Sequence, residues 1–354
     1  MKNLFGYFVL VSVILVSCKK DDPPVPPVVP GEYENGILVL NEGLYQQNNA
    51  SLSFYSLENN QVYTQSFFLE NARGLGDTAN DFEKYTIDGV EYIIIAVDVS
   101  SQLEIVEANT LISVAQIPVF DGANAREPRR IKIYGTKAFV CNFDGTVTVV
   151  DLVSKSIIST IVVGANPDGL VSIGNKLYVS NSGGLNFPVY DSTITIINMD
   201  NYQIENTIQS RVNSSKMFVD SQNEIYLMSS GNYSTINPAL VRINTTTNQV
   251  IQTFDIPIEA MTQVGIWIYY YDSDQKSILR LNTTSEILEG AVIINCAGYE
   301  TFYGLEYNAD LNLIYCFDAN GYVNSSTVKC YNTSGIFQYE FTAELNARKI
   351  IYND

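Results

Sequence analysis

Residues 127–164 read EPRRIKIYGTKAFVCNFDGTVTVVDLVSKSIISTIVVG, and the rest of the chain repeats this unit. Valines and threonines alternate over 146–149, the period of a half-buried β-strand. Asp144-Gly145 is typical of tight hairpin turns, whose two central residues both have positive φ. We expect four consecutive antiparallel strands, at 129–133, 137–143, 146–150 and 156–163.

The second of these segments, an apolar run ending near a short polar residue, recurs seven times. The copies are ILVLN (37–41), IIAVD (94–98), AFVCN (138–142), LYVSN (177–181), IYLMS (225–229), WIYYY (267–271) and LIYCF (313–317). Their spacing averages about 46 residues, close to the periods of propeller repeats. The expected turn between third and fourth strands also recurs seven times, beginning near residues 56, 107, 151, 198, 244, 282 and 332.

Four-stranded antiparallel meanders repeated in this way predict an all-β, seven-bladed β-propeller. The first copy begins at its second strand, and the last is followed by a spare segment, ARKIIYN (347–353). Pairing this segment beside 37–41 would close the ring and remove an exposed sheet edge. The alternative architecture is two β-sandwiches in tandem.

The N-terminal region divides the chain into three parts. Residues 1–17 have the pattern of a signal peptide, with an early lysine and then an apolar run too short to span a membrane. The end of this run, Leu15-Val16-Ser17-Cys18, resembles a bacterial lipobox, which implies lipidation of Cys18. The alternative is an ordinary secretory signal followed by an incidental cysteine. Residues 18–35 contain PPVPPVVP and read as an extended tether, and 36–354 form the propeller.

The formal net charge of -18 opposes binding to phosphate backbones, so we expect no nucleic-acid partner. Cys316 and Cys330 are expected on neighbouring strands, where an oxidising compartment would permit a disulfide bond. Cys141 and Cys296 are expected to be buried free thiols. No cysteine spacing resembles a zinc site, and we expect no metal and no cofactor.

The chain contains no histidine, which excludes Ser-His-Asp and Cys-His catalysis and histidine-ligated metals. A general base would have to be a carboxylate or a lysine with a shifted pKa. Carboxylates alone could hydrolyse glycosides, but no localised pair is evident. We therefore expect a protein that is not an enzyme, with a carboxylate-based lyase or hydrolase as a lesser alternative.

A propeller places binding residues at one mouth of its channel, where second strands end and first strands begin. Polar residues at these positions, with aromatic residues from long neighbouring loops, would form a polar floor with aromatic walls. The equally weighted alternative is that they cap strands and bind neighbouring backbones. The candidate ligand-binding residues are Asn41, Glu42, Asn80, Asp81, Asp98, Arg126, Arg129, Asn142, Asp168, Asn181, Tyr233, Tyr271, Asp272 and Asp318.

Two stretches go beyond a generic propeller: VLNEGLYQQNNASLSFYSLENNQV (39–62) and LENARGLGDTAND (69–81). They resemble the opening of surface lipoproteins that capture cobalamin for a TonB-dependent outer-membrane transporter. The whole chain resembles the wider YncE-like and YVTN-repeat propellers. The run Lys19-Lys20-Asp21-Asp22 resembles the signal that sends lipoproteins of Bacteroidetes-type bacteria to the cell surface.

The resemblance implies a lipid-anchored outer-membrane protein that faces the cell exterior, binds a small nutrient such as a corrinoid and passes it to a transporter. It implies membrane attachment through the lipid alone. Because the chain lacks histidine, a corrinoid would be recognised through its amides and by aromatic contact. The alternative function is a protein-interaction propeller without a small-molecule ligand.

Overall fold

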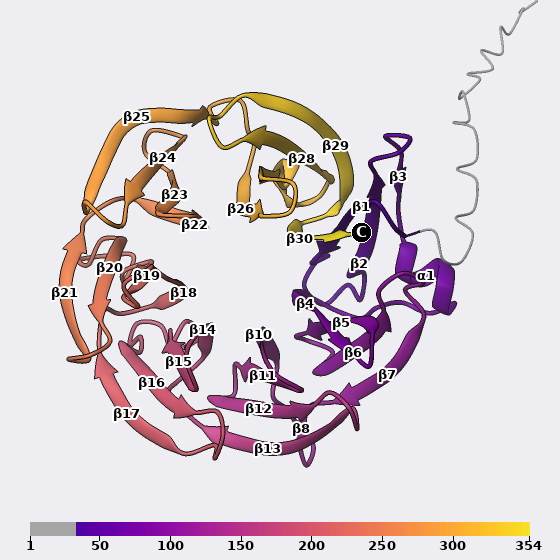
Figure 1. The fold of residues 1–354 in the computed structure, drawn as a ribbon, viewed down its shortest axis with the longest axis horizontal. Helices are drawn as coiled ribbons and strands as arrows, with labels where there is room; N and C mark the ends of the chain where they lie inside the picture. Colours follow the sequence, from indigo (N-terminus) through magenta and orange to yellow (C-terminus); the bar gives the residue numbers. More distant parts are fainter. Residues whose placement is uncertain (1–32) are drawn as a thin grey trace, which may run out of the picture.

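The computed structural model describes residues 33–354, which form a closed ring of seven four-stranded antiparallel sheets (Figure 1). The expected signal peptide, lipidated Cys18 and most of the expected tether lie outside the described residues. Within residues 33–354, no helix is long and apolar enough to cross a membrane. The predicted fold class is confirmed.

The strands of each blade follow one another from the channel outward. Blade 1 has β30 (Ala347–Asn353), β1 (Gly36–Asn41), β2 (Ser51–Ser56) and β3 (Val62–Tyr63). Blade 2 has β4 (Ala79–Ile87), β5 (Val90–Val97), β6 (Gln102–Glu107) and β7 (Ser113–Pro118). Blade 3 has β10 (Pro128–Tyr134), β11 (Lys137–Asn142), β12 (Thr146–Asp151) and β13 (Ser156–Val162). Blade 4 has β14 (Pro167–Ile173), β15 (Lys176–Asn181), β16 (Thr193–Asn198) and β17 (Ile204–Gln209).

Blade 5 has β18 (Ser214–Val219), β19 (Ile225–Ser229), β20 (Ala239–Asn244) and β21 (Gln249–Phe254). Blade 6 has β22 (Ile258–Val264), β23 (Trp267–Asp272), β24 (Ser277–Asn282) and β25 (Ile287–Asn295). Blade 7 has β26 (Phe302–Asn308), β27 (Leu313–Asp318), β28 (Ser325–Asn332) and β29 (Phe337–Leu345). Three short additions complete the described chain: α1 (Ser66–Asn71), the hairpin β8 (Phe120–Asp121) and β9 (Asn124–Ala125), and the 3-10 helix η1 (Asn320–Tyr322).

The ring closes as the sequence predicts, because β30 pairs antiparallel with β1 and contributes the innermost strand of blade 1. At the end of β30, the buried side-chain amide of Asn353 donates to the carbonyls of Tyr33 and Ala108. These hydrogen bonds tie the C-terminal strand to blade 2 and to the start of the described chain. Closure therefore joins residues more than 300 positions apart.

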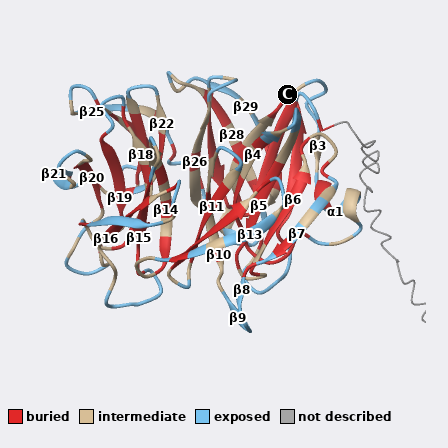
Figure 2. Cartoon of the chain, turned by 60° about the horizontal axis from the view of Figure 1, so that its bottom comes forward, coloured by how far each residue is buried: buried red, intermediate tan, exposed pale blue. Residues whose placement is uncertain are grey.

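Seven apolar clusters form the core, and each lies between two neighbouring blades. In β5, Ile93 and Ile95 face blade 1, whereas Ile94 and Ala96 face blade 3. Both faces of the central strands are thus covered, and Figure 2 shows these strands as the most buried part of the ring. This explains why the second strands read as continuous apolar runs.

The four strands predicted in residues 127–164 are all present, but the Asp144-Gly145 turn differs from the expectation. Asn142 pairs with Thr146, which leaves three loop residues instead of two. Only Gly145 has positive φ, at 87°. The loop resembles a type I turn followed by one left-handed residue, so the expectation of two positive-φ residues is wrong at this turn.

The four described cysteines are buried free thiols, as expected for Cys141 and Cys296. The suggested disulfide bond between Cys316 and Cys330 is absent. In the pairing of β27 with β28, Cys330 lies opposite Tyr315 and Cys316 opposite Lys329. This one-residue offset puts the two thiols on opposite faces of blade 7, where they pack into different clusters.

Candidate functional site

Every innermost strand has a β-bulge or irregularity close to its first residue, and we call the first unpaired residue of each strand the bulge ring. Bulges re-aim side chains and are frequent beside functional sites. The bulge ring lies on the mouth face, where innermost strands begin and second strands end. Its members, in blade order 2 to 7 and then 1, are Asn80, Arg129, Asp168, Ser215, Glu259, Tyr303 and Arg348.

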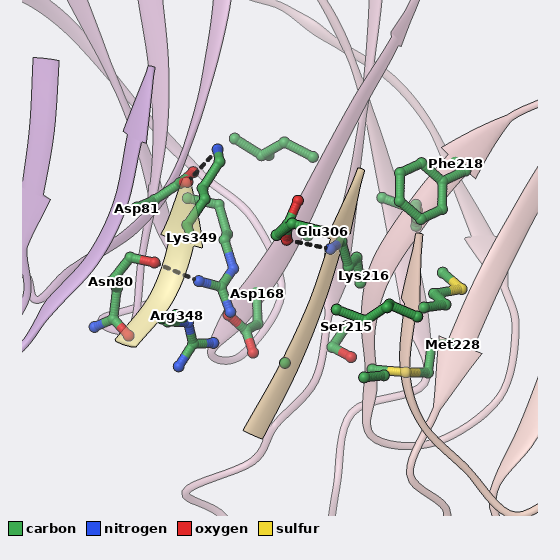
Figure 3. A pocket seen from close by; sticks show the side chains of 18 of the residues that line it. Asn80, Asp81, Asp168, Ser215, Lys216, Phe218, Met228, Glu306, Arg348 and Lys349 are labelled. Carbon is green, nitrogen blue, oxygen red and sulfur yellow. Dashed lines mark hydrogen bonds and ion pairs between the residues drawn. The ribbon is translucent and has the colours of Figure 1, made fainter. Parts of the chain in front are cut away.

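The bulge ring surrounds an axial channel of about 470 Å³, lined by residues from all seven innermost strands. Six members of the ring line this channel, and Arg129 lies just behind the lining. Figure 3 shows an unequal lining, with Asn80, Asp168 and Arg348 on one side and Met228 on the other. The channel thus has a charged side from blades 1 to 4 and a more apolar side from blades 4 to 7.

Arg129 is the centre of a buried ion network at the mouth. Its Nη1 donates to Oδ2 of Asp98 at 2.8 Å, and its Nε lies 3.4 Å from Oδ1 of Asp168. Its guanidinium lies 4.0 Å from the centre of the Phe143 ring, in cation–π geometry. Asn80 donates to the same Asp98 oxygen at 2.7 Å. Burial raises the pKa of Asp98, and Arg129 offsets this effect only in part.

Asp168 lies among three arginines. Arg130 approaches it at 3.2 Å while donating to the backbone carbonyl of Asn80 at 2.9 Å. Burial alone would raise the pKa of Asp168, but Arg130, Arg129 and Arg348 outweigh burial and hold this pKa below its ordinary value. Asp168 is therefore an anion that arginines stabilise, unsuited to act as a proton donor at neutral pH.

Arg348 and Tyr303 share one carboxylate on the other side of the charged wall. Arg348 Nη1 donates to Glu42 Oε2 at 2.8 Å, and the Tyr303 hydroxyl donates to the same oxygen at 2.5 Å. Burial would raise the pKa of Glu42, but Arg348 and Tyr303 outweigh it and lower this pKa. Burial raises the pKa of Tyr303, and the neighbouring Glu42 carboxylate raises it further.

A second layer of charges lies further along the innermost strands. Lys216 of blade 5 donates to Glu306 of blade 7 at 2.7 Å, spanning blade 6. Lys349 donates to both Asp81 and Glu83 at 2.6 Å. Burial and the neighbouring Asp81 raise the pKa of Glu83, although Lys349 opposes this shift. These pairs bridge the inner strands below the mouth.

The structure brings six of the sequence-predicted residues together at the mouth and in the channel below it. Three of them, Asn80, Asp81 and Asp168, line the channel directly. The other three belong to the surrounding ion network: Glu42, Asp98 and Arg129.

Three predicted asparagines at the ends of second strands lie behind the mouth and are fully buried: Asn41, Asn142 and Asn181. Each donates to two hydroxyls on the third strand of its own blade, as Asn142 does to Thr146 and Thr148 at 2.9 Å. Their hydrogen bonds match the alternative of strand capping.

The remaining five candidates lie outside the channel lining. Arg126 pairs with Asp144 and Asp121. The ring of Tyr271 stacks on Phe302 with centroids 3.8 Å apart. Asp272 and Asp318 accept hydrogen bonds from backbone amides of nearby loops. Tyr233 is exposed on a mouth-face loop, beside Tyr190.

Several channel residues were not among the sequence-predicted candidates: Glu83, Arg130, Ser215, Lys216, Glu259, Tyr303, Glu306 and Lys349. Strand alternation assigns neighbouring residues such as Arg129 and Arg130 to opposite faces, but the bulge brings both to the mouth. The available signal was positional, because all of these residues except Glu83 and Glu306 lie at the second or third position of an innermost strand. The described residues contain no group of three or more acids and cysteines arranged to hold a metal ion.

Comparison with solved structures shows the fold alone, because the three similar structures described below are all less than 25% identical to this chain. A quinonprotein alcohol dehydrogenase-like protein from Bacteroides thetaiotaomicron is 13% identical with a TM-score of 0.64, covering 91% of this chain and 79% of that one. Hydrazine synthase from Kuenenia stuttgartiensis is 16% identical with a TM-score of 0.58, over 69% and 74%. The computationally designed Ika8 protein is 9% identical with a TM-score of 0.57, over 87% and 88%.

A comparison with curated proteins found no match. A family model does match, over residues 35–334, which include most of all seven blades. It covers well over half of the chain, so the protein belongs to the family described as "Domain of unknown function (DUF5074)".

Proposed function

We propose that this protein is a binding propeller that takes a small ligand at the mouth of its axial channel and performs no reaction on it. The observation that carries this proposal is the convergence of the bulge ring on one channel. Its volume, about 470 Å³, falls within the range of about 300–1,000 Å³ typical of small-molecule sites. Apolar walls with a few convergent polar groups are also typical of such sites.

A corrinoid is the leading candidate ligand. The two stretches that resemble cobalamin-capture lipoproteins, 39–62 and 69–81, contribute Glu42, Asn80 and Asp81 to the mouth and channel. The corrin ring system is larger than the channel, so a corrinoid would lie across the mouth and enter with a peripheral substituent. Exposed Phe187 and Tyr233, on mouth-face loops of blades 4 and 5, offer aromatic surface beside it.

The charges of the channel favour binding over catalysis. Asp81, Glu83, Asp168 and Glu306 each pair with a lysine or an arginine. Glu259 is the one channel acid that has no ion pair among residues 33–354. Catalysis by carboxylates needs one acid that donates a proton and a second that acts as base or nucleophile. An ion pair with lysine or arginine hinders a carboxylate in either role.

The route of the chain into the propeller suits a surface-anchored protein. Tyr33 contacts Asn353 at the end of β30, on the face opposite the mouth. Figure 2 shows the same arrangement, with the C-terminus on one face and the β8–β9 hairpin on the other. A lipid anchor at Cys18 would leave the mouth accessible to a ligand and to an outer-membrane transporter of the TonB-dependent kind.

Cyanocobalamin binding tests this proposal by co-elution of its absorbance with the purified protein. We expect retention at micromolar protein, recovery of unchanged cyanocobalamin, and loss of retention in Ser215→Trp, which fills the mouth. The matched control is Ser285→Trp, an exposed turn residue at the opposite end of blade 6, which should bind normally. No retention by the native protein would exclude the corrinoid, and retention unaffected by Ser215→Trp would exclude the mouth. A chemically altered product would exclude a role limited to binding.

A second candidate, a protein-interaction propeller, is favoured by exposed apolar side chains on mouth-face loops: Tyr45, Leu185, Phe187, Val189, Tyr233 and Val323. Large exposed apolar groups gathered on one face are common at protein contacts. Purification of the tagged protein from its own outer membrane tests this candidate. A co-purifying transporter that is lost in Phe187→Ser/Tyr233→Ser, without cyanocobalamin binding, would favour interaction alone.

A further inference from the structure

Two arginines on the charged side of the channel retain most of their hydrogen-bonding capacity. A guanidinium has five N–H donors. Arg130 uses one on the Asn80 carbonyl and directs another toward Asp168, and Arg348 uses one on Glu42. The other guanidinium N–H groups of Arg130 and Arg348 make no hydrogen bond to any residue among 33–354.

The positions of both arginines make these donors available to a ligand. Arg130 and Arg348 line the channel, and their side chains remain 21% and 25% exposed although they emerge from core strands. A rigid guanidinium fork matches the two oxygens of a carboxylate or phosphate, which makes arginine the usual residue for such recognition. The charged wall can therefore accept an oxyanion from the channel.

Three arginines and three carboxylates alternate along the charged wall, so its charges balance. Asp168 is shared among Arg129, Arg130 and Arg348, while Asp98 and Glu42 lie on the outer sides of this group. Burial lowers the pKa of Arg130, and repulsion from Arg348 and Arg129 adds to this effect in opposition to Asp168. An oxyanion would therefore be recognised through the unused N–H donors of Arg130 and Arg348, since the wall carries no excess of positive charge.

The opposite side of the channel has a different chemistry. Phe218 and Met228 line it together with Ala260 and Leu305. Figure 3 shows Phe218 and Met228 across from Arg348. A ligand that contacts both sides needs a charged end and an apolar body.

We propose that the channel binds a small amphipathic organic anion, with its carboxylate or phosphate held by Arg130 and Arg348 and its apolar part against Phe218 and Met228. This inference rests on the proposed binding function and names the chemistry of the ligand. A corrinoid meets the requirement through a phosphate-bearing substituent, whereas a ligand without an anionic group does not.

Titration calorimetry at constant ionic strength tests the inference with hexanoate, hexyl phosphate, acetate and hexylammonium as probes. We expect hexanoate or hexyl phosphate to bind at least tenfold more tightly than acetate, because their alkyl chains bury methylene groups against the apolar side of the channel. Hexylammonium should not bind. The stronger of the two six-carbon anions identifies whether the site prefers carboxylate or phosphate.

Variants test the arginine directly. Arg130→Met should weaken binding of the preferred anion at least tenfold. Arg130→Lys should weaken it less, because lysine keeps the positive charge but lacks the guanidinium fork. The control is Arg211→Met, a similarly exposed arginine that pairs with Asp255 outside the channel lining and should bind normally. Unfolding midpoints of all variants establish that the ring remains intact.

The outcomes separate this inference from the proposed function. Hexylammonium binding as tightly as hexanoate, or Arg130→Met binding like the native protein, overturns the anion site. Retention of cyanocobalamin without binding of either six-carbon anion also overturns it, while the proposed function stands. Anion binding without cyanocobalamin supports the inference and excludes the corrinoid, and absence of all binding overturns both.

Discussion

The innermost strands of blades 4 and 5 approach each other closely at Gly169. A Cβ atom placed there would lie 2.0 Å from the carbonyl oxygen of Ser215 and 2.5 Å from the hydroxyl of Ser180. The Ser180 hydroxyl donates to this same carbonyl at 2.6 Å. Gly169→Ala must therefore separate the strands and break this hydrogen bond. The change also disturbs the channel, because Gly169 follows Asp168 and faces Ser215.

The expected loss of stability combines two effects. Overpacking costs about 1–3 kcal/mol, and loss of one hydrogen bond costs about 0.5–1.5 kcal/mol, so we expect about 1.5–4.5 kcal/mol in total. With an m-value of about 3 kcal/mol/M, the urea unfolding midpoint should fall by about 1 M. Ligand affinity should fall with it.

Gly290→Ala is the matched control, because a Cβ atom at this exposed position of β25 meets no atom within 4 Å. Its free energy of unfolding should change by less than about 0.5 kcal/mol. Equal midpoints for Gly169→Ala and Gly290→Ala would refute the close approach of the two inner strands, and with it the geometry of the mouth between blades 4 and 5.

Three further predictions concern closure, acid stability and the thiols. Asn353→Ala leaves two buried carbonyls without a donor and should cost about 1–3 kcal/mol in urea unfolding; an unchanged midpoint would argue against closure through this residue. The pKa of Asp168 is lowered in the folded protein, so its ionisation stabilises the fold above about pH 4 and this contribution is lost as pH falls through the lowered pKa. The difference in stability between the native protein and Asp168→Asn should therefore narrow on acidification below about pH 4; a constant difference would contradict the assigned ion pairs. Burial raises thiol pKa values, to about 12 for Cys141 and Cys296 and about 11 for Cys330, so a thiol reagent at pH 8 should label none of the four described cysteines before unfolding. Labelling of the folded protein, or a disulfide detected by mass spectrometry, would show that one of them is accessible or paired.

The strands and their closure could be predicted because their signals are local. Turn residues separate the segments in 127–164, and the apolar runs repeat at a constant interval. The spare segment 347–353 follows from counting strands, since the first copy lacks its innermost one. Each of these features depends on short-range chemistry that the chain repeats seven times.

The ring of channel charges could be predicted only in part. In RRIKI, alternation places Arg129 and Arg130 on opposite faces, but an unpaired residue at the bulge changes the direction of both. The Lys216–Glu306 pair joins residues 90 positions apart in non-adjacent blades, and no local pattern reports such a contact. Pairing across the channel depends on the geometry of the whole ring, which no single segment of the sequence specifies.

The sequence repeats a pattern of one asparagine followed by two hydroxyl residues, and the structure explains it by hydrogen bonds. The segments SLS at 51–53, TVT at 146–148 and TIT at 193–195 follow the three asparagines at the ends of second strands. Each asparagine donates to both hydroxyls of its segment. This recurrence of an asparagine with two spaced hydroxyls is the pattern that strand capping would leave in the sequence.

A crystal structure of the protein soaked with 6-bromohexanoate tests the central claim most directly, because the bromine and the carboxylate locate the two ends of one molecule. We predict carboxylate density at Arg130 and Arg348, and an anomalous bromine peak beside Phe218 and Met228. Bromine outside the channel, or a channel left empty while the compound binds elsewhere, would contradict a ligand site at the mouth of the ring.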